Sequence, residues 1–180
     1  MSAPLSIASV CAVAVFLALC VTTDLTSRRI PNALTLTGMI VGLTLGGLTH
    51  GLEGFGASGI GLVLAVALLI VPFALGGIGG GDVKMMAAVG ALVGPHALLA
   101  SLLAGMILGG VVAVGVLWRR GRLREKLHVV GAMLRSALLM RSLDPLRAPA
   151  AGTETIALPY SVPLGLGTAL ALSWQYTMGT

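Results

Sequence analysis

Long apolar runs, separated by short polar or glycine-rich breaks, make up most of the chain. They occupy residues 4–22, 33–49, 58–75, 83–95, 96–118 and 158–175. As helices, runs of these lengths suit a hydrocarbon layer of about 30 Å. Lipid offers no partner to free backbone groups, so spanning segments of this kind must be helical. The pattern predicts an all-α membrane protein with six transmembrane helices, in a single domain over residues 1–180.

A basic segment at residues 119–157 separates the fifth run from the sixth and carries eight of the eleven Lys and Arg residues. Within it, leucine and valine recur at helical spacing opposite arginine and histidine. This pattern predicts an amphipathic helix on an anionic lipid surface, with a dock for a partner protein or for the substrate as the alternative. If the Arg28-Arg29 loop is cytoplasmic, six alternating spans put all eleven basic residues on that side, as the positive-inside rule requires.

Composition supports a membrane protein and excludes several other classes. Hydrophobic residues make up 57% of the chain and charged residues 9%, which is too apolar for an ordinary soluble domain. The net charge of +5 comes from clustered topology determinants, and aromatic residues are only 4%, so no nucleic-acid binding is expected. The two cysteines and three histidines show no metal-ligand spacing, so we expect no metal and no cofactor.

Glycines recur at four-residue spacing inside several runs. They are Gly38, Gly42 and Gly46, then Gly90 and Gly94, then Gly105 and Gly109. Small residues at this spacing let helix backbones approach closely in lipid. We therefore expect helix–helix contacts at these positions.

Two of the six acidic residues, Asp24 and Asp82, lie where apolar runs meet the predicted cytoplasmic side. Ionisable groups are costly there, so they are candidates for function. Only about 13 residues, or roughly 20 Å of helix, separate Asp82 from the turn at Gly94-Pro95, which places Asp82 below the inner face. Residues 76–81 are then expected to be irregular backbone beside a wet pocket. A simple helix N-cap is the alternative interpretation of Asp82.

A second motif follows the first apolar run. Asp24 ends that run, and Pro31 forces Ile30 towards an extended conformation before the next helix begins near Asn32. Arg28 lies one turn beyond Asp24 and could neutralise it. In that interpretation, these charged groups are ordinary determinants of topology.

Together the two motifs resemble those of the type IV prepilin peptidases, the GxGD class of intramembrane aspartic proteases. The matching residues are Asp24, Ile30, Pro31 and Asn32, then Gly79, Gly80, Gly81, Asp82 and Lys84, and finally Pro159 and Tyr160. The resemblance implies that Asp24 and Asp82 are the catalytic pair. The other matching residues and Arg28 are expected to shape the site or bind substrate, and Lys84 is a candidate to pair with an aspartate.

The resemblance also implies an activity and a location. The protein is expected to be an aspartic endopeptidase that removes a short basic leader from type IV or Flp-like prepilins, and its compact form resembles the peptidases of Flp pilus systems or archaeal-type preflagellin peptidases. It would act at the cytoplasmic face of a prokaryotic inner membrane, with anionic lipids and the pilus assembly machinery as further partners. Longer members carry a cytoplasmic domain with paired CxxC motifs and an N-methyltransferase activity. Nothing here corresponds to that domain, so methylation is not expected.

Three alternatives remain open from the sequence. A small transporter could use Asp24 and Asp82 to relay protons or bind a cation. Residues 56–59, Gly-Ala-Ser-Gly, resemble a rhomboid serine-protease motif, with Ser58 as nucleophile and His96 as base. A catalytically idle assembly subunit is the third.

Overall fold

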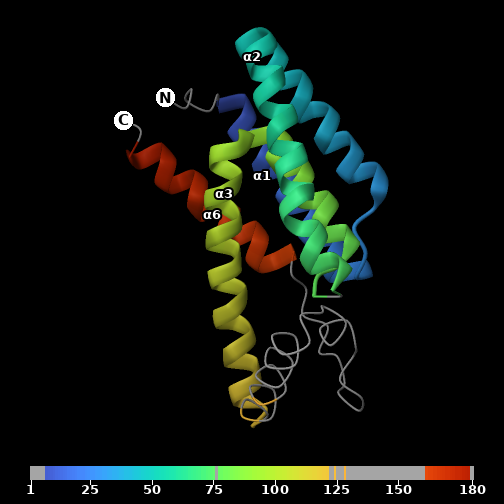
Figure 1. The fold of residues 1–180 in the computed structure, drawn as a ribbon, viewed down its shortest axis with the longest axis vertical. Coiled ribbons are helices and arrows are strands. Elements are labelled where there is room, and N and C mark those ends of the chain that lie inside the picture. The colour runs from blue at the N-terminus through green and yellow to red at the C-terminus, as the bar shows by residue number, and fades with distance from the viewer. Residues whose placement is uncertain (1–6, 76, 122–123, 125–127, 129–160, 179–180) are drawn as a thin grey trace, which may run out of the picture.

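The structure is a computed structural model that describes residues 7–75, 77–121, 124, 128 and 161–178. Its elements are α1 (Ile7–Ser27), α2 (Asn32–Ala74), α3 (Gly80–Arg119) and α6 (Ser161–Met178), and the described residues contain no strand (Figure 1). The predicted all-α fold is confirmed over these residues. The predicted amphipathic helix and the motif residues Pro159 and Tyr160 fall outside the described residues.

Three of the described helical stretches are long and apolar enough to cross a membrane. They are Ser9–Ser27, Asn32–Ala74 and Gly80–Arg119, and a shorter apolar helix covers Ser161–Trp174. Large hydrophobic side chains lie exposed along all four, for example Val15, Leu68, Ile107 and Leu170. In water such a surface would be unfavourable, whereas in lipid it costs nothing.

The two longest helices each contain a backbone break. In α2 the break is at His50 (φ −132°) and Gly51 (φ +62°), and in α3 it is at Gly94 (φ +77°). Both glycines adopt the left-handed region, which other residues enter only at a cost. Figure 1 shows α2 reversing direction at its break, so that residues 32–49 and 52–74 form two limbs.

These breaks fall where the sequence predicted turns, but the first is tighter than expected. The second limb of α2 starts at about residue 52, not at residue 58 as the apolar pattern suggested. The reason is that the chain reverses within two non-helical residues, His50 and Gly51, so no longer loop is needed between the two limbs. The break in α3 divides it into residues 80–93 and 95–119, at the predicted Gly94-Pro95 turn.

The first limb of α3 is the centre of the bundle. Every residue from 85 to 93 is buried there, with α2 as the main neighbour. A Cβ added at Gly42 would lie only 2.6 Å from the carbonyl carbon of Ala91, and one at Gly61 would overlap the carbonyl of Gly90. Glycine at these positions therefore allows both limbs of α2 to lie backbone-to-backbone against α3. Gly94 takes part in the same contact through its backbone, since a Cβ at Gly61 would lie 3.1 Å from its carbonyl carbon, whereas a Cβ at Gly94 itself would meet nothing within 4 Å.

Helix α6 packs against α3 and α1. A Cβ at Gly167 would overlap the backbone of Gly105 on the second limb of α3, and one at Gly165 would lie 3.3 Å from the side chain of Val21 on α1. In Figure 1, α6 crosses the bundle obliquely, with its N-terminal end lower in the view than its C-terminal end. This packing determines where the first residue of α6, Ser161, lies.

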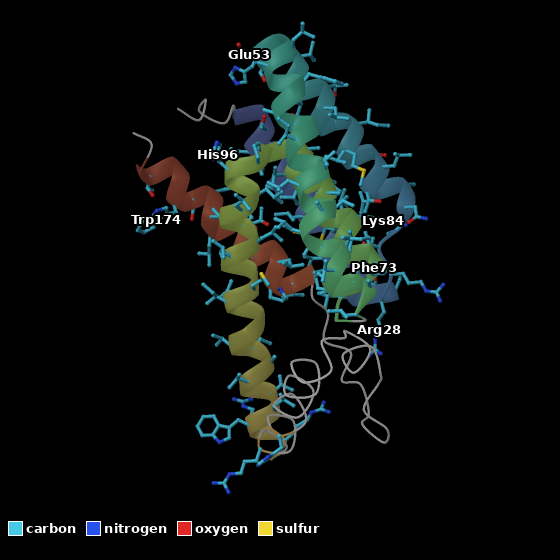
Figure 2. All side chains as sticks on the ribbon, in the orientation of Figure 1. Arg28, Glu53, Phe73, Lys84, His96 and Trp174 are labelled. Carbon is cyan, nitrogen blue, oxygen red and sulfur yellow. The ribbon has the colours of Figure 1, made fainter. Side chains whose placement is uncertain are left out.

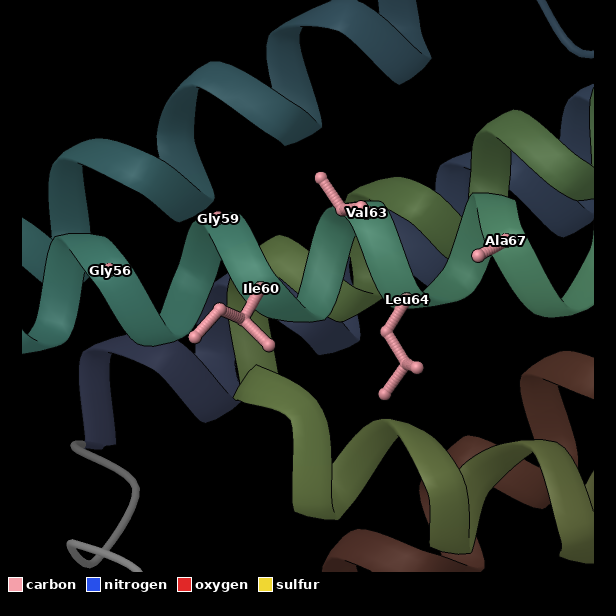
Figure 3. Close-up of a pocket in the computed structure, with 6 residues that line it drawn as sticks. All are labelled: Gly56, Gly59, Ile60, Val63, Leu64 and Ala67. Atoms are coloured by element: carbon pink, nitrogen blue, oxygen red, sulfur yellow. The ribbon is translucent and has the colours of Figure 1, made fainter.

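The second limb of α2 also carries an apolar groove of about 470 Å³. Figure 3 shows its lining, which consists of Gly56, Gly59, Ile60, Val63, Leu64 and Ala67. None of these side chains can donate a proton, attack a carbonyl or bind an ion. The groove therefore offers no catalytic chemistry.

Candidate active site

A second cavity, of about 540 Å³, brings the two sequence motifs together. Its lining consists of Asp24, Arg28, Arg29, Ile30, Pro31, Asn32, Gly79, Gly80, Gly81 and Asp82. Figure 2 shows Arg28, Phe73 and Lys84 towards one end of the bundle and Glu53 at the opposite end. The two aspartates, which lie far apart in the sequence, therefore line the same cavity.

Asp82 lies in the first turn of α3. Gly79 is the N-cap, in an extended conformation (φ −78°, ψ 149°), and Asp82 is the third residue of the helix. Its Oδ2 accepts a hydrogen bond of 3.3 Å from the backbone N–H of Gly79. A carboxylate at this position satisfies one of the N–H groups that a helix start leaves without an intrahelical partner. Asp82 therefore supports the helix start without being its N-cap.

The irregular backbone before α3 is shorter than the predicted stretch of residues 76–81. Gly80 and Gly81 belong to α3, so the irregular part ends at Gly79. Helix formation extends to Gly80 because the Asp82 carboxylate caps the turn from within. A Cβ at Gly81 would lie 3.5 Å from the Cβ of Ile30, so the loop between α1 and α2 passes directly over this turn.

Asp24 lies in the last turn of α1 and is half-buried. Its Oδ2 accepts a hydrogen bond from the hydroxyl of Ser161, the first residue of α6. Its backbone carbonyl accepts a hydrogen bond of 2.8 Å from the N–H of Arg28. Arg28 has φ +50° and so ends α1 as a left-handed residue, with its side chain exposed beside the cavity. The contact that the structure shows between Arg28 and Asp24 is thus a backbone hydrogen bond and not a pairing of their charged side chains.

The loop after α1 carries the rest of the first motif. Pro31 is the N-cap of α2, in an extended conformation (φ −60°, ψ 134°), and its carbonyl accepts the N–H of Leu34 at 3.1 Å and of Thr35 at 3.3 Å. Ile30 packs against the hydrophobic core. Proline at this position fixes the turn into α2, so the loop closes one side of the cavity.

Lys84 is tied to the first motif through Asn32. Its Nζ donates a hydrogen bond of 2.9 Å to Asn32 Oδ1. Among the described residues, its hydrogen-bond partner is this amide and not an aspartate, so the suggested pairing of Lys84 with a catalytic carboxylate is not what the structure shows. The bond joins Asn32, the first residue of α2 and part of the cavity lining, to Lys84, the fifth residue of α3.

Comparison with known proteins identifies the family. A family model described as the type IV leader peptidase family matches residues 11–114, more than half of the chain. The chain belongs to the type IV leader peptidase family. The match includes Asp24, Asp82 and every other residue that lines the cavity. Comparisons with curated proteins and with solved structures found no match.

Family membership turns several expectations into findings. The protein is a membrane-embedded leader peptidase, and the class of substrate for such an enzyme is a prepilin. The family match ends before α6, so it says nothing about Ser161. Sequence reasoning missed this residue, although a hydroxyl directly after the Pro159-Tyr160 motif was a signal that could have marked it.

The serine-protease alternative finds no geometric support in this leader peptidase. Ser58 is buried, and its hydroxyl donates a hydrogen bond of 3.3 Å to the carbonyl of Gly42 between the two limbs of α2. His96 is exposed near the turn of α3 (Figure 2). Ser58 therefore serves helix packing. In the part of the chain that the structure describes, no group of three or more His, Cys, Asp and Glu side chains is arranged to hold a metal ion.

The Lys84–Asn32 bond yields a testable prediction for the leader peptidase. Asn32→Ala and Lys84→Ala should each lower the stability of the detergent-solubilised protein by about 1 kcal/mol or less, because the bond is exposed. The double variant should be as stable as the less stable of the two single variants, because both changes remove the same bond. Thermal unfolding of the four proteins measures this. Losses that simply add would show that the two side chains do not act together.

Proposed function

We propose that this leader peptidase is an aspartic endopeptidase that removes the short basic leader of Flp-type prepilins. It acts at the cytoplasmic face of a prokaryotic inner membrane, with Asp24 and Asp82 as the catalytic pair. The observation that carries the proposal is the cavity in which both carboxylates meet the glycine motif. The other residues lining this cavity, together with Lys84, Pro159 and Tyr160, shape the site or contact the substrate.

The helix breaks support an arrangement of six membrane spans. If α2 and α3 each cross the membrane twice, with their turns at His50-Gly51 and Gly94, then α1 and α6 complete the six. The first limb of α3, residues 80–93, is about 21 Å long, which is shorter than a hydrocarbon layer of about 30 Å. Asp82 then lies below the cytoplasmic surface, in a cavity that water can enter. Arg28, Arg29 and Lys84 flank this end, as expected for the cytoplasmic side.

The proposed reaction uses one proton shared between the two carboxyl groups. The charged carboxylate takes a proton from water as the water oxygen attacks the scissile carbonyl carbon. The protonated carboxyl group donates a hydrogen bond to the carbonyl oxygen, and a proton is then delivered to the leaving amine. Asp24 and Asp82 can share this work because both line the same cavity.

The irregular backbone before α3 is the proposed place for the leader. Gly79 ends this segment three residues before Asp82, and its own N–H and carbonyl already bond to Asp82 and Val83. The backbone left for a substrate is therefore that of Ile78, directly before it. An extended peptide can pair with exposed strand-like backbone and so present its scissile bond to a neighbouring catalytic group. The basic segment at residues 119–157 would hold anionic lipids or the pilus assembly machinery nearby.

Co-expression with candidate Flp-type prepilins tests this function. We expect leader removal to appear as a gel shift, and the mass of the mature N-terminus to match cleavage after a leader glycine without methylation. A prepilin whose leader glycine is replaced by valine serves as the matched control and should stay uncut. If no prepilin is cut while vesicles containing the chain conduct protons, the carboxylates belong to a transporter instead.

A further inference from the structure

Ser161 is a buried polar residue that the proposed reaction does not yet use. It is fully buried, it is the first residue of α6, and it lies beyond the stretch that matches the family. Its hydroxyl donates to Asp24 Oδ2 across 137 residues of sequence. The other fully buried hydroxyls bond within their own helices: Ser101 donates to Ala97 and Thr168 to Leu164. Of these three fully buried hydroxyls in the described part of the chain, the one on Ser161 bonds to a proposed catalytic carboxylate.

The position of Ser161 is determined by tight packing of α6. One turn further along the helix, a Cβ at Gly165 would lie 3.3 Å from Val21, and Leu164 lies against Gly105 of α3. A Cβ at Gly167 would overlap the backbone of Gly105, so α6 lies closely against α3 as well as against α1. The hydroxyl is therefore presented to Asp24 by a rigid element rather than by a loop.

The two aspartates are held in a similar way. Asp82 Oδ2 accepts from the backbone N–H of Gly79, and Asp24 Oδ2 accepts from the hydroxyl of Ser161. Each carboxyl group thus has one oxygen anchored by a donor from the protein. The other oxygen of each remains for the shared proton, the water and the scissile carbonyl. Asp24 differs in that its anchor comes from another helix, so its orientation depends on α6.

We propose that Ser161 is a positioning residue: by holding Asp24 Oδ2, it directs Oδ1 of Asp24 towards the water and the substrate. This inference rests on the proposed function. It assigns α6 a part in the reaction. A carboxyl group without this anchor could rotate about its side-chain torsions and leave the reactive geometry, and misplacement of a catalytic group by about 1 Å can cost on the order of 100-fold in rate.

The test compares kcat and KM for prepilin cleavage by the purified full chain. In Ser161→Ala we expect kcat to fall about 10- to 100-fold, with KM within about twofold of wild type, because the change affects orientation in the reaction and not substrate affinity. Ser161→Thr keeps a hydroxyl and should restore most of kcat. Ser101→Ala is the matched control, since it removes an equally buried hydroxyl that bonds only Ala97, and it should retain wild-type kcat.

The possible outcomes separate clearly. A kcat within twofold of wild type in Ser161→Ala overturns the inference, and so does a loss that Ser161→Thr does not restore. If Ser161→Ala does not insert, Ser161→Cys replaces it, because a thiol is of similar size but a weak donor, and its kcat must then fall below that of Ser161→Thr. If wild type cuts no prepilin, the proposed function fails and this inference fails with it.

Discussion

Asp24→Asn and Asp82→Asn should each lower the rate of leader cleavage by about 1,000-fold or more, since removing one member of a catalytic pair that acts as a unit disables the whole. Asparagine has nearly the size of aspartate, and its carbonyl oxygen can still accept from Ser161 or from the N–H of Gly79. The fold and the anchoring bonds should therefore persist. What asparagine cannot do is take a proton from water or share one. The readout is the fraction of prepilin processed over time in membranes.

Glu53→Gln is the matched control for these variants. It makes the same kind of change at an exposed acid at the opposite end of the bundle (Figure 2), so it should cleave at the wild-type rate. All three variants should be present in the membrane fraction at the wild-type level. Activity above one tenth of wild type in either aspartate variant would rule out the two-carboxylate mechanism.

The second large effect is expected at Gly90, where the central limb of α3 meets α2. A Cβ at this position would overlap the carbonyl of Gly61 and lie 3.2 Å from the backbone nitrogen of Leu62. Backbone cannot rotate away as a side chain can, so Gly90→Val must push the two helices apart. We expect a loss of about 3 kcal/mol, at the upper end for an overpacked core, and a fall in apparent Tm of about 5–10 °C.

Gly110→Val separates this contact from the general effect of valine in a helix. Gly110 also lies in α3, but it is exposed and a Cβ there would meet nothing within 4 Å. Its variant should keep the wild-type Tm within about 2 °C, because the added methyl groups would lie in lipid or detergent. Heating followed by size-exclusion chromatography measures both. Equal losses in the two variants would show that the close approach of α2 and α3 is not what Gly90 provides.

The outline of the fold followed from the sequence because it depends on local properties. Apolar runs predict helices wherever they occur, and glycine or a Gly-Pro pair predicts where a helix can turn. The exact turn did not follow, since the gap between the apolar runs 33–49 and 58–75 predicted a longer break than the one observed at His50 and Gly51. Likewise, Gly80 and Gly81 were expected outside the helix because the short helix from Asp82 to Gly94-Pro95 places residues 76–81 below the inner face, but α3 begins at Gly80, with the Asp82 carboxylate bonded to Gly79.

The site was predictable only as far as its motifs are local. Asp24 and Asp82 could be selected because a carboxylate at the edge of an apolar run is unusual, and both lie in the cavity. The hydrogen-bond partners of the motif residues could not be predicted from local sequence. Asn32 and Lys84 are 52 residues apart, and Asp24 and Ser161 are 137 apart. Each pairing depends on how helices pack side by side, and the chain has many serines and threonines whose hydroxyls bond only their own helix.

The bond between Asp24 and Ser161 also has a consequence for biosynthesis. A chain is made from its N-terminus, so Asp24 and Asp82 reach the membrane while residue 161 is still unmade. At about 5–20 residues per second, the delay between Asp82 and Ser161 is on the order of 10 s. During that interval both carboxylates are present but Asp24 lacks its anchor. If Asp24 and Asp82 are the catalytic pair, the growing chain carries an incomplete site, and the proposed protease becomes complete only when α6 has docked.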